Sequence, residues 1–150
     1  MIKSYSKINL FLRVLSKTNN GLHNIQSSVM LIDLHDRIKI KTINKKKDKI
    51  KFLGQFKKNI NNKINSITKS LNLLRKYGLI NKRIKYQILI NKKIPVFAGL
   101  GGGTSNAVFL IKYFLKNKIN ERLLKIFEKK IGSDFRLFFF KNSFQKNLKK

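Results

Sequence analysis

A glycine-rich loop between a predicted strand and a predicted helix constrains this chain more than any other feature. Residues 95–106 read P-V-F-A-G-L-G-G-G-T-S-N and contain half of the chain's eight glycines. An alternating run at 83–90 precedes the loop, and an apolar run at 107–115 follows it. Glycine permits positive φ and close approach to the backbone, and the free N–H groups of a helix start attract anions. The loop therefore predicts either a phosphate site or a tight corner without a ligand.

The loop does not match the two commonest nucleotide-binding motifs. No lysine follows its last glycine, as a Walker loop requires. The final glycine of the dinucleotide fingerprint is missing, as is a second strand with an acidic end. Thr104 and Ser105 add hydroxyls that could cap the following helix or reach a phosphate or its metal. The segment is therefore either a nucleotide-binding loop of another class or a tight structural turn without a ligand.

Residue patterning predicts one α+β domain with mostly antiparallel strands. Alternating apolar residues indicate strands at 8–15, 24–34, 36–43, 50–52 and 83–90, and a very apolar run indicates another at 135–140. Apolar residues at steps of three and four indicate helices at 61–77, 107–115 and 120–131. The basic tail at 141–150 is expected to be frayed.

This patterning predicts which residues share a face in the first strand and in the first helix. In the first strand, Ile8, Leu10, Leu12 and Val14 are expected to be buried, which places Lys7 and Asn9 together on the opposite face. In the first helix, the buried stripe is expected to contain Ile64, Ile67, Leu71 and Leu74. Gly78 suits the position just after that helix, and Asn120 could cap the third helix.

The composition gives the chain an extreme positive charge. Lys and Arg number 35 against 6 Asp and Glu, for a net charge of +29. Such a field attracts polyanions, including ATP and RNA. The lysines are spread along the whole chain, however, and occur together with the many Asn and Ile residues that AT-rich coding produces, so coding bias explains much of the charge. The absence of cysteine excludes disulfides and thiolate metal sites. No run is apolar and long enough to cross a bilayer, so a cytoplasmic protein is expected.

Each of the six acidic residues can be interpreted individually. Asp48 lies in a lysine-rich turn and is expected to be a solvated charge, and Asp33 and Asp36 are expected to flank a turn between strands. Glu121 and Glu128 lie on the third predicted helix, where Glu128 is expected to face water. Asp134 follows a helix end and precedes an apolar run, so it is either a positioned base or an ordinary turn residue.

Four segments together resemble the GHMP small-molecule kinases. They are S-K-I-N-L-F-L at 6–12, G-L-H-N-I-Q-S at 21–27, K-I-P-V-F-A-G-L-G-G-G-T-S-N-A at 93–107 and I-G-S-D-F at 131–135. Within that superfamily they are most similar to kinases that phosphorylate 4-diphosphocytidyl-2-C-methyl-D-erythritol with ATP in the non-mevalonate route to isoprenoids. The resemblance implies a ribosomal-protein-S5-domain-2-like N-terminal domain at 1–140, with helices packed on one face of the sheet. It also implies that the family's second, C-terminal domain is absent from this sequence.

The resemblance also implies roles for individual residues. Asp134 would be the catalytic base, and Lys7 would hold the acceptor hydroxyl, Asp134 and the transferring phosphoryl in register. Asn9 and His23 would contact a cytidine-diphosphate-linked polyol, and Asn65 would lie near the adenine of ATP, which would bind with Mg²⁺. The phosphate loop would comprise Pro95, Val96, Phe97, Ala98, Gly99, Leu100, Gly101, Gly102, Gly103, Thr104 and Ser105.

The sequence departs from this family at several places. Leu22 replaces an aromatic residue before the histidine, Phe97 and Ala98 stand where the loop usually has glycine, and F-R-L-F follows Asp134 in place of V-P-V-F. Three hypotheses remain open: a truncated kinase that is active alone or with a partner chain supplying the missing half, a degenerate nucleotide-binding remnant, and a basic RNA-binding module. The last has no aromatic-basic recognition motif behind it.

Overall fold

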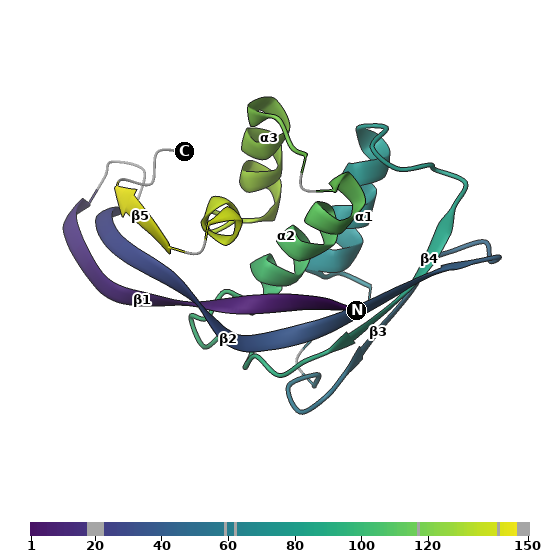
Figure 1. Ribbon diagram of the computed structural model, residues 1–150, viewed down its shortest axis with the longest axis horizontal. Helices are drawn as coiled ribbons and strands as arrows, with labels where there is room; N and C mark the ends of the chain where they lie inside the picture. Colours follow the sequence, from purple (N-terminus) through teal and green to yellow (C-terminus); the bar gives the residue numbers. More distant parts are fainter. Residues whose placement is uncertain (18–22, 59, 62, 117, 141, 147–150) are drawn as a thin grey trace.

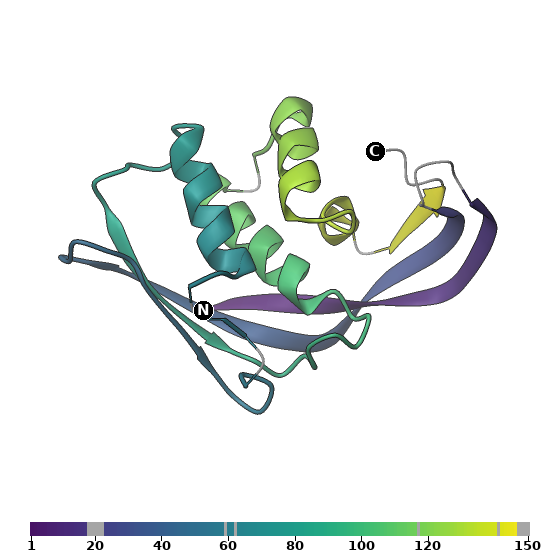
Figure 2. The same ribbon diagram turned by 180° about the vertical axis from the view of Figure 1, so that it is seen from behind.

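The fold is one mixed sheet with all three helices on the same face, as Figure 1 and the reverse view in Figure 2 show. The computed structural model describes residues 1–17, 23–58, 60–61, 63–116, 118–140 and 142–146. The strands are β1 (Ile2–Lys17), β2 (His23–Ile43), β3 (Lys49–Leu53), β4 (Lys85–Asn91) and β5 (Asn142–Lys146), the helices are α1 (Ser66–Lys76), α2 (Gly102–Leu115) and α3 (Glu121–Ile131), and η1 (Arg136–Phe139) is a 3₁₀ helix. The predicted α+β class is confirmed. No helix in the described part is long and apolar enough to span a membrane.

The strand order β1-β2-β4-β3, with β5 also paired to β2, contains one parallel pair. β1, β4 and β5 each run antiparallel to β2, as the sequence predicts. β3 and β4 run parallel, which the sequence analysis did not predict. Parallel neighbours need a crossover connection, and α1 supplies it between these two strands.

β2 is a single long strand where the sequence predicts two strands and a turn. The expected turn between Asp33 and Asp36 is therefore wrong. Its place is taken by an irregularity in the ladder with β1, where Tyr5 pairs with His35 but Ser6 pairs with Ile32. A bulge of this kind absorbs extra residues in one strand without ending it, so the local turn signal does not break the strand.

A second irregularity in β1 changes which residues share a face. Asn9 pairs with Val29, but Leu12 pairs with Ser27 and Val14 with Ile25, because the ladder shifts between residues 9 and 11. Odd-numbered residues of β2 share one face, so Leu12 and Val14 lie on the same face as Asn9 and not opposite to it. The expected burial is also wrong, since Leu12 and Val14 are 56% and 58% exposed.

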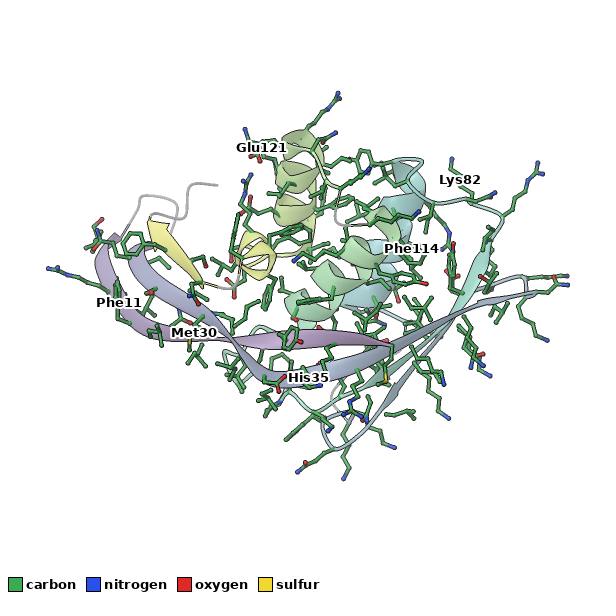
Figure 3. The ribbon with its side chains drawn as sticks, in the orientation of Figure 1. Phe11, Met30, His35, Lys82, Phe114 and Glu121 are labelled. Atoms are coloured by element: carbon green, nitrogen blue, oxygen red, sulfur yellow. The ribbon has the colours of Figure 1, made fainter. Side chains whose placement is uncertain are left out.

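The distal parts of β1 and β2, together with β5, form an arm that extends away from the helices. Phe11 lies on this arm (Figure 3), and its ring is 6.1 Å from that of Phe144 across the strand between them. The sequence predicts a frayed tail here, but Asn142–Lys146 forms β5 and pairs with β2. The predicted strand at 135–140 is also wrong, because η1 occupies most of it.

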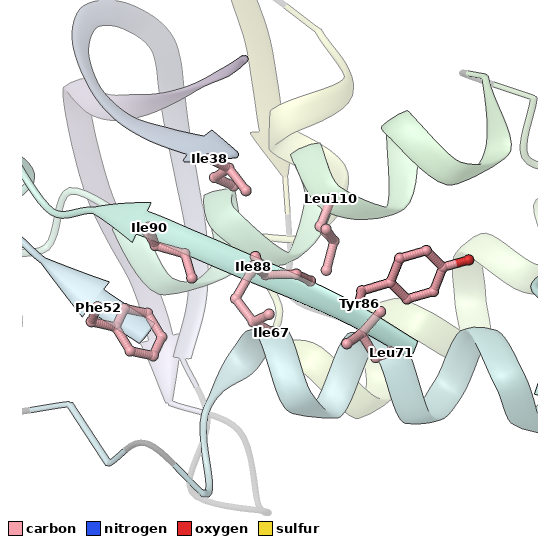
Figure 4. Close-up of a cluster of buried hydrophobic side chains, with 8 residues drawn as sticks. All are labelled: Ile38, Phe52, Ile67, Leu71, Tyr86, Ile88, Ile90 and Leu110. Atoms are coloured by element: carbon pink, nitrogen blue, oxygen red, sulfur yellow. The ribbon is translucent and has the colours of Figure 1, made fainter. Parts of the chain in front are cut away.

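Two clusters of buried side chains make up the core. The first fills the space between the sheet and α1 and α2 (Figure 4) and comprises Ile38, Phe52, Ile67, Leu71, Tyr86, Ile88, Ile90 and Leu110. The second lies beneath α3 and η1 and comprises Leu73, Leu74, Val108, Ile111, Phe127, Phe135 and Phe138. The predicted helical stripe is confirmed apart from Ile64, which precedes α1 and is exposed. The Asn120 cap of α3 and the left-handed Gly78 after α1 are also confirmed.

Asp48 ties three elements together and is not the solvated charge that the sequence analysis expected. Its carboxylate accepts hydrogen bonds from both terminal nitrogens of Arg75 on α1 and from the N–H of Tyr86 on β4. Burial alone would raise the pKa of Asp48, but the hydrogen bonds from Arg75 and Tyr86 and the Arg75 charge together hold that pKa below its ordinary value. The turn before β3 is thereby fixed to the helix layer.

Asp48→Asn should lower the free energy of unfolding by about 2 kcal/mol at pH 7, because charged hydrogen bonds to Arg75 are lost. The lowered pKa means that the stabilisation is fully present above the unfolded value near 3.8 and disappears as pH falls through the folded value. Urea unfolding at pH 7 and near pH 3 checks this. The two proteins should converge at the acid end, and Asp33→Asn, whose side chain is 80% exposed, should match the parent throughout.

Candidate active site

A pocket of about 420 Å³ opens at the start of α2. The glycine loop forms one wall, and residues from β3 and from the segment leading into α1 form the other. Every predicted loop residue from Pro95 to Thr104 lines it, together with Phe52, Ile60, Asn61, Ile64, Asn65, Ser66, Lys92 and Asn106. The volume falls in the range of small-ligand sites.

The N-terminus of α2 points open amides at this pocket. Asn65 and Asn120 cap α1 and α3 with their side chains, whereas Gly101, the N-cap of α2, supplies no side-chain cap. Ser105 N–H bonds to the carbonyl of Gly101, which leaves the preceding amides of the first turn without helical acceptors. An uncapped helix start that lines a pocket is suited to a phosphate group.

Two of the loop glycines are needed because the backbone is packed against its neighbours. A Cβ on Gly101 would lie 2.7 Å from the Phe138 ring and 3.2 Å from the Lys7 side chain. A Cβ on Gly102 would lie 2.9 Å from Ile94, whereas one on Gly103 would meet nothing within 4 Å. The loop therefore sits tightly on β1 and η1 on one side and is open on the other.

Gly101→Ala should destabilise the protein by about 1–3 kcal/mol, since it adds both a clash and a left-handed alanine. The φ of Gly101 is 69°, and the Phe138 side chain that it would strike is fully buried. Thermal unfolding measures the effect. Gly103→Ala is the matched control, because it adds the same methyl group within a helix and into open space, where alanine is favoured. Equal stabilities of the two variants would show that the close packing at Gly101 does not matter.

Phe97 is a strained residue at the mouth of the pocket. Its φ of 63° lies in the left-handed region, and its side chain is 90% exposed. Bulky residues seldom adopt this conformation, whereas glycine does so without strain. The family resemblance implied glycine at this position, and the backbone keeps the conformation that glycine would favour.

Phe97→Gly should therefore raise the free energy of unfolding by about 1 kcal/mol, because relief of the left-handed strain exceeds the added flexibility of glycine. Phe140→Gly removes another exposed ring at a φ of −120° and should lower stability instead. Chemical denaturation of both variants provides the comparison. A loss of stability in Phe97→Gly would show that the ring makes a stabilising contact.

Lys7 and Asp134, from opposite ends of the sequence, meet beside the loop. Lys7 Nζ lies 3.4 Å from Asp134 Oδ2, with the lysine side chain 10% and the aspartate side chain 32% exposed. Lys7 Nζ also donates to Asn9 Oδ1 at 2.8 Å, and the backbone N–H of Lys7 donates to the carbonyl of Leu100 at 3.0 Å. One strand residue thus contacts both the phosphate loop and the carboxylate.

Asp134 is held by the short connection between α3 and η1. The η1 turn begins with Leu137 N–H bonding to the Asp134 carbonyl at 3.1 Å. Arg136 then clamps η1 to α3 by donating to Glu128 at 2.8 Å and to Glu121 at 2.6 Å. These two carboxylates raise the pKa of Arg136. Glu128 is 31% exposed, so the expectation that it faces water holds only in part, because its carboxylate also pairs with Arg136.

A buried pair anchors the segment that leads into the loop. Asp36 on β2 forms an ion pair with Lys92, and its other oxygen accepts from the N–H groups of Lys93 at 2.7 Å and Ile94 at 2.9 Å. Both members of the pair are buried, and Lys92 also lines the pocket. Neither role was expected from the sequence. The available signal was the spacing of Asp36, Ile38 and Ile40, which places the carboxylate on the same strand face as two apolar side chains.

Three predicted site residues remain, and each lies in different surroundings. The Ser105 hydroxyl is buried and bonds to the Tyr5 carbonyl and to Ser4, so it ties α2 to β1 and does not line the pocket. Asn65 lines the pocket while its side chain accepts from Thr68 N–H. His23 pairs with Lys17 in the ladder, but its side chain lies outside the described residues.

Comparison with known proteins gives consistent matches. A family model for the GHMP kinases N terminal domain matches residues 62–136. A curated 4-diphosphocytidyl-2-C-methyl-D-erythritol kinase from Pelagibacter ubique is 46% identical over 136 residues, which cover 89% of this chain and 47% of the relative. A protein with the same name from Pseudothermotoga lettingae is 35% identical over 136 residues, covering 88% of this chain and 46% of the relative. The chain thus spans about half the length of these relatives.

Solved structures share the fold at lower identity. A crystal structure of 4-(cytidine 5'-diphospho)-2C-methyl-D-erythritol kinase has a TM-score of 0.70 at 22% identity and covers 97% of this chain and 53% of its own. A mevalonate kinase has a TM-score of 0.61 at 22% identity, covering 97% of this chain and 55% of its own. In both cases nearly the whole of this chain superposes on about half of the larger protein.

Proposed function

Because this chain belongs to the GHMP kinase family, we propose that it carries the ATP-binding half of a kinase that phosphorylates 4-diphosphocytidyl-2-C-methyl-D-erythritol. The observation that supports this most strongly is the Lys7–Asp134 contact of 3.4 Å beside the open start of α2. The substrate is the one named for relatives that are 46% and 35% identical over most of this chain. The product would enter the non-mevalonate route to isoprenoids.

The pocket suits ATP at both of its ends. The amides of residues 102–104 and the dipole of α2 can receive the phosphates. Phe52, Ile60 and Ile64 offer apolar surface at the end where the base would lie. Asn61 and Asn65 line the same end, and their side-chain oxygens accept from N–H groups of Lys63, Ile64 and Thr68, which fixes the shape of this wall. Within the described residues, no three His, Cys, Asp or Glu side chains gather to hold a metal ion. Mg²⁺ would bind with ATP mainly through phosphate oxygens, with the Thr104 hydroxyl beside it, and would neutralise phosphate charge.

Asp134 is proposed to act as the general base. Its carboxylate would take the proton from the acceptor hydroxyl as that oxygen bonds to the γ-phosphorus and the bond to the bridging β-γ oxygen breaks, releasing ADP. Lys7 would place its ammonium between the carboxylate and the transferring group, while Asn9 restrains the lysine from its other side. Asn9 and His23 would contact the cytidine-diphosphate-linked polyol. Positioning and charge neutralisation are what phosphoryl transfer chiefly requires.

The exposed arm is where a second half of the enzyme would pack. Large apolar side chains that are more than 40% exposed lie on it: Leu10, Phe11, Leu12, Val14, Leu15 and Phe144. Apolar clusters of this kind mark interaction surfaces. Residues 1–140 would then be the N-terminal domain, and polypeptide equivalent to the second half of the relatives would cover the arm. Leu12 and Val14 share a face with Asn9, so this polypeptide would complete the acceptor side of the active site.

An assay with and without a complementary half tests the proposal. The C-terminal half of the Pelagibacter ubique relative would be expressed separately and mixed with this chain, and transfer of labelled phosphate from ATP to the cytidyl substrate would be measured. Turnover by the mixture, or by this chain alone, supports the proposal. Saturable ATP binding without turnover in either case would identify a nucleotide-binding remnant. RNA binding with neither ATP binding nor turnover would favour the basic RNA-binding module.

A further inference from the structure

A second pocket, of about 450 Å³, shares no lining residue with the first. The turn before β3 and the starts of β3 and β4 form one side of it, and α1 with the segment before it forms the other. Its lining residues are Lys46, Lys47, Asp48, Ile50, Lys63, Thr68, Asn72 and Lys85. None of the proposed steps of phosphoryl transfer uses this pocket.

The pocket carries a net positive charge, because four lysines line it beside one carboxylate, Asp48. Lys85 is the most engaged of the four: its charge helps to lower the pKa of Asp48, and its Nζ donates to the Lys82 carbonyl at 2.7 Å. In the described part of the chain, none of its four lysines forms an ion pair with an acidic side chain. Asp48 is the one carboxylate that lines it, and Arg75 and the Tyr86 N–H already occupy both oxygens of that group. Four ammonium groups around one concavity repel each other, and a bound anion would relieve that repulsion.

Thr68 provides a second, independent indication. Its hydroxyl oxygen is buried and has no hydrogen-bond partner among the described residues, although the residue lines the pocket. Buried polar groups in folded proteins are nearly always paired, so an unpaired hydroxyl calls for an explanation. A ligand with hydrogen-bond acceptors would accept from the Asn72 amide, and from the Thr68 hydroxyl after a rotation of that side chain toward the pocket, because the hydroxyl oxygen is buried.

We propose that this pocket binds a small oligophosphate, such as pyrophosphate or tripolyphosphate. Several separated ammonium groups suit more than one phosphate, and lysine binds phosphate as a compact point charge. Among the described residues that line the pocket, Ile50 is the one large apolar residue and none is aromatic, so these residues offer no surface for stacking a base. The chemistry therefore favours inorganic oligophosphate over a nucleoside or single-stranded RNA.

A charge-matched pair of variants tests the site. K46Q/K47Q/K63Q/K85Q removes the pocket lysines, and K118Q/K125Q/K129Q/K130Q removes the same charge on and before α3. Amide shifts in ¹H–¹⁵N spectra, followed during tripolyphosphate titration, report this pocket through residues 46–50 and 68 and the glycine loop through residues 99–104. The pocket variant should bind at least about tenfold more weakly at residues 46–50, and the α3 variant should bind nearly as the parent does.

Two results would overturn the proposal. Equal weakening in both variants would show that binding follows net charge alone. Shifts at residues 46–50 with a short RNA, but not with tripolyphosphate, would assign the surface to nucleic acid. Because the glycine-loop amides are read separately, failure here leaves the kinase proposal untouched, and failure of nucleotide binding at the loop leaves this one untouched.

Thr68→Val replaces the hydroxyl by a methyl group and tests whether this hydroxyl binds the ligand or stabilises the fold. Removing a buried unpaired hydroxyl should leave thermal stability without phosphate unchanged or higher. Tripolyphosphate should then raise the melting temperature of this variant less than that of the parent. A drop in stability without phosphate would show that the hydroxyl already has a structural partner, and an unchanged response to tripolyphosphate would show that it does not contact the ligand. Either result would remove Thr68 from the site.

Discussion

Asp134→Asn should reduce kcat for phosphoryl transfer by roughly 10²- to 10⁴-fold, the usual contribution of a general base. Asparagine has nearly the same shape but cannot take the proton from the acceptor hydroxyl. The ATP affinity should change little, because the glycine-loop amides do not depend on this carboxylate. The measurement is steady-state kinetics of the active assembly, with ATP binding followed separately by calorimetry.

Two further variants make the Asp134 result interpretable. Asp33→Asn removes the same charge at a side chain that is 80% exposed, and it should keep full activity. Lys7→Gln should also lower kcat, and the double variant should lose less than the two single losses combined, because the two residues act as a unit. Full activity in Asp134→Asn would end the assignment of the base. Loss of ATP binding in that variant would show that the carboxylate serves the fold and not the reaction.

The sequence predicts the glycine loop well because its signals are local. A strand, four glycines and a helix start are contiguous in the chain, and the structure places the glycines and the helix start around one pocket. Lys7 gives no comparable signal in a chain with 35 Lys and Arg. Only the similarity to the GHMP kinases distinguished it from the other lysines, and the fold then brought it to 3.4 Å from Asp134.

The failed predictions about β1 and β3 share a cause, because both depend on which strands pair. Alternation along β1 correctly placed Lys7 and Asn9 together, but the ladder shift after Asn9 moved Leu12 and Val14 to the same face. The shift is a property of the β1–β2 pair and leaves no mark in β1 alone. In the same way, the parallel pairing of β3 with β4 follows from how α1 crosses between them.

The predictions were also wrong for acidic residues whose ion-pair partners are distant in the sequence. Asp48 and Asp36 each look like turn residues, yet Asp48 binds Arg75 on α1 and Asp36 binds Lys92 next to the glycine loop. With only six acidic residues against 35 basic ones, an acid that the fold buries always has candidate partners. Local sequence cannot choose among them, so these two anchors became visible only in the structure.

Asp36→Ala should lower the free energy of unfolding by about 3–5 kcal/mol, the cost of leaving one member of a buried ion pair without its partner. The Asp36 side chain is fully buried and that of Lys92 is 3% exposed. Two backbone N–H groups, of Lys93 and Ile94, would lose their acceptor as well. Since a small domain is stable by only about 5–15 kcal/mol, much of the protein should unfold at physiological temperature, which urea titration at lower temperature would quantify.

A double variant separates the unpaired charge from the lost anchor. Asp36→Leu with Lys92→Met removes both charges and keeps the volume, so it should recover part of the lost stability. It should not restore ATP binding fully, because the N–H groups of Lys93 and Ile94 that fix the approach to Pro95 remain without the carboxylate. Asp33→Asn, three residues away and exposed, should unfold as the parent does. If Asp36→Ala matched that control, the buried pair would not hold the loop, and the placement of the open α2 amides would need another cause.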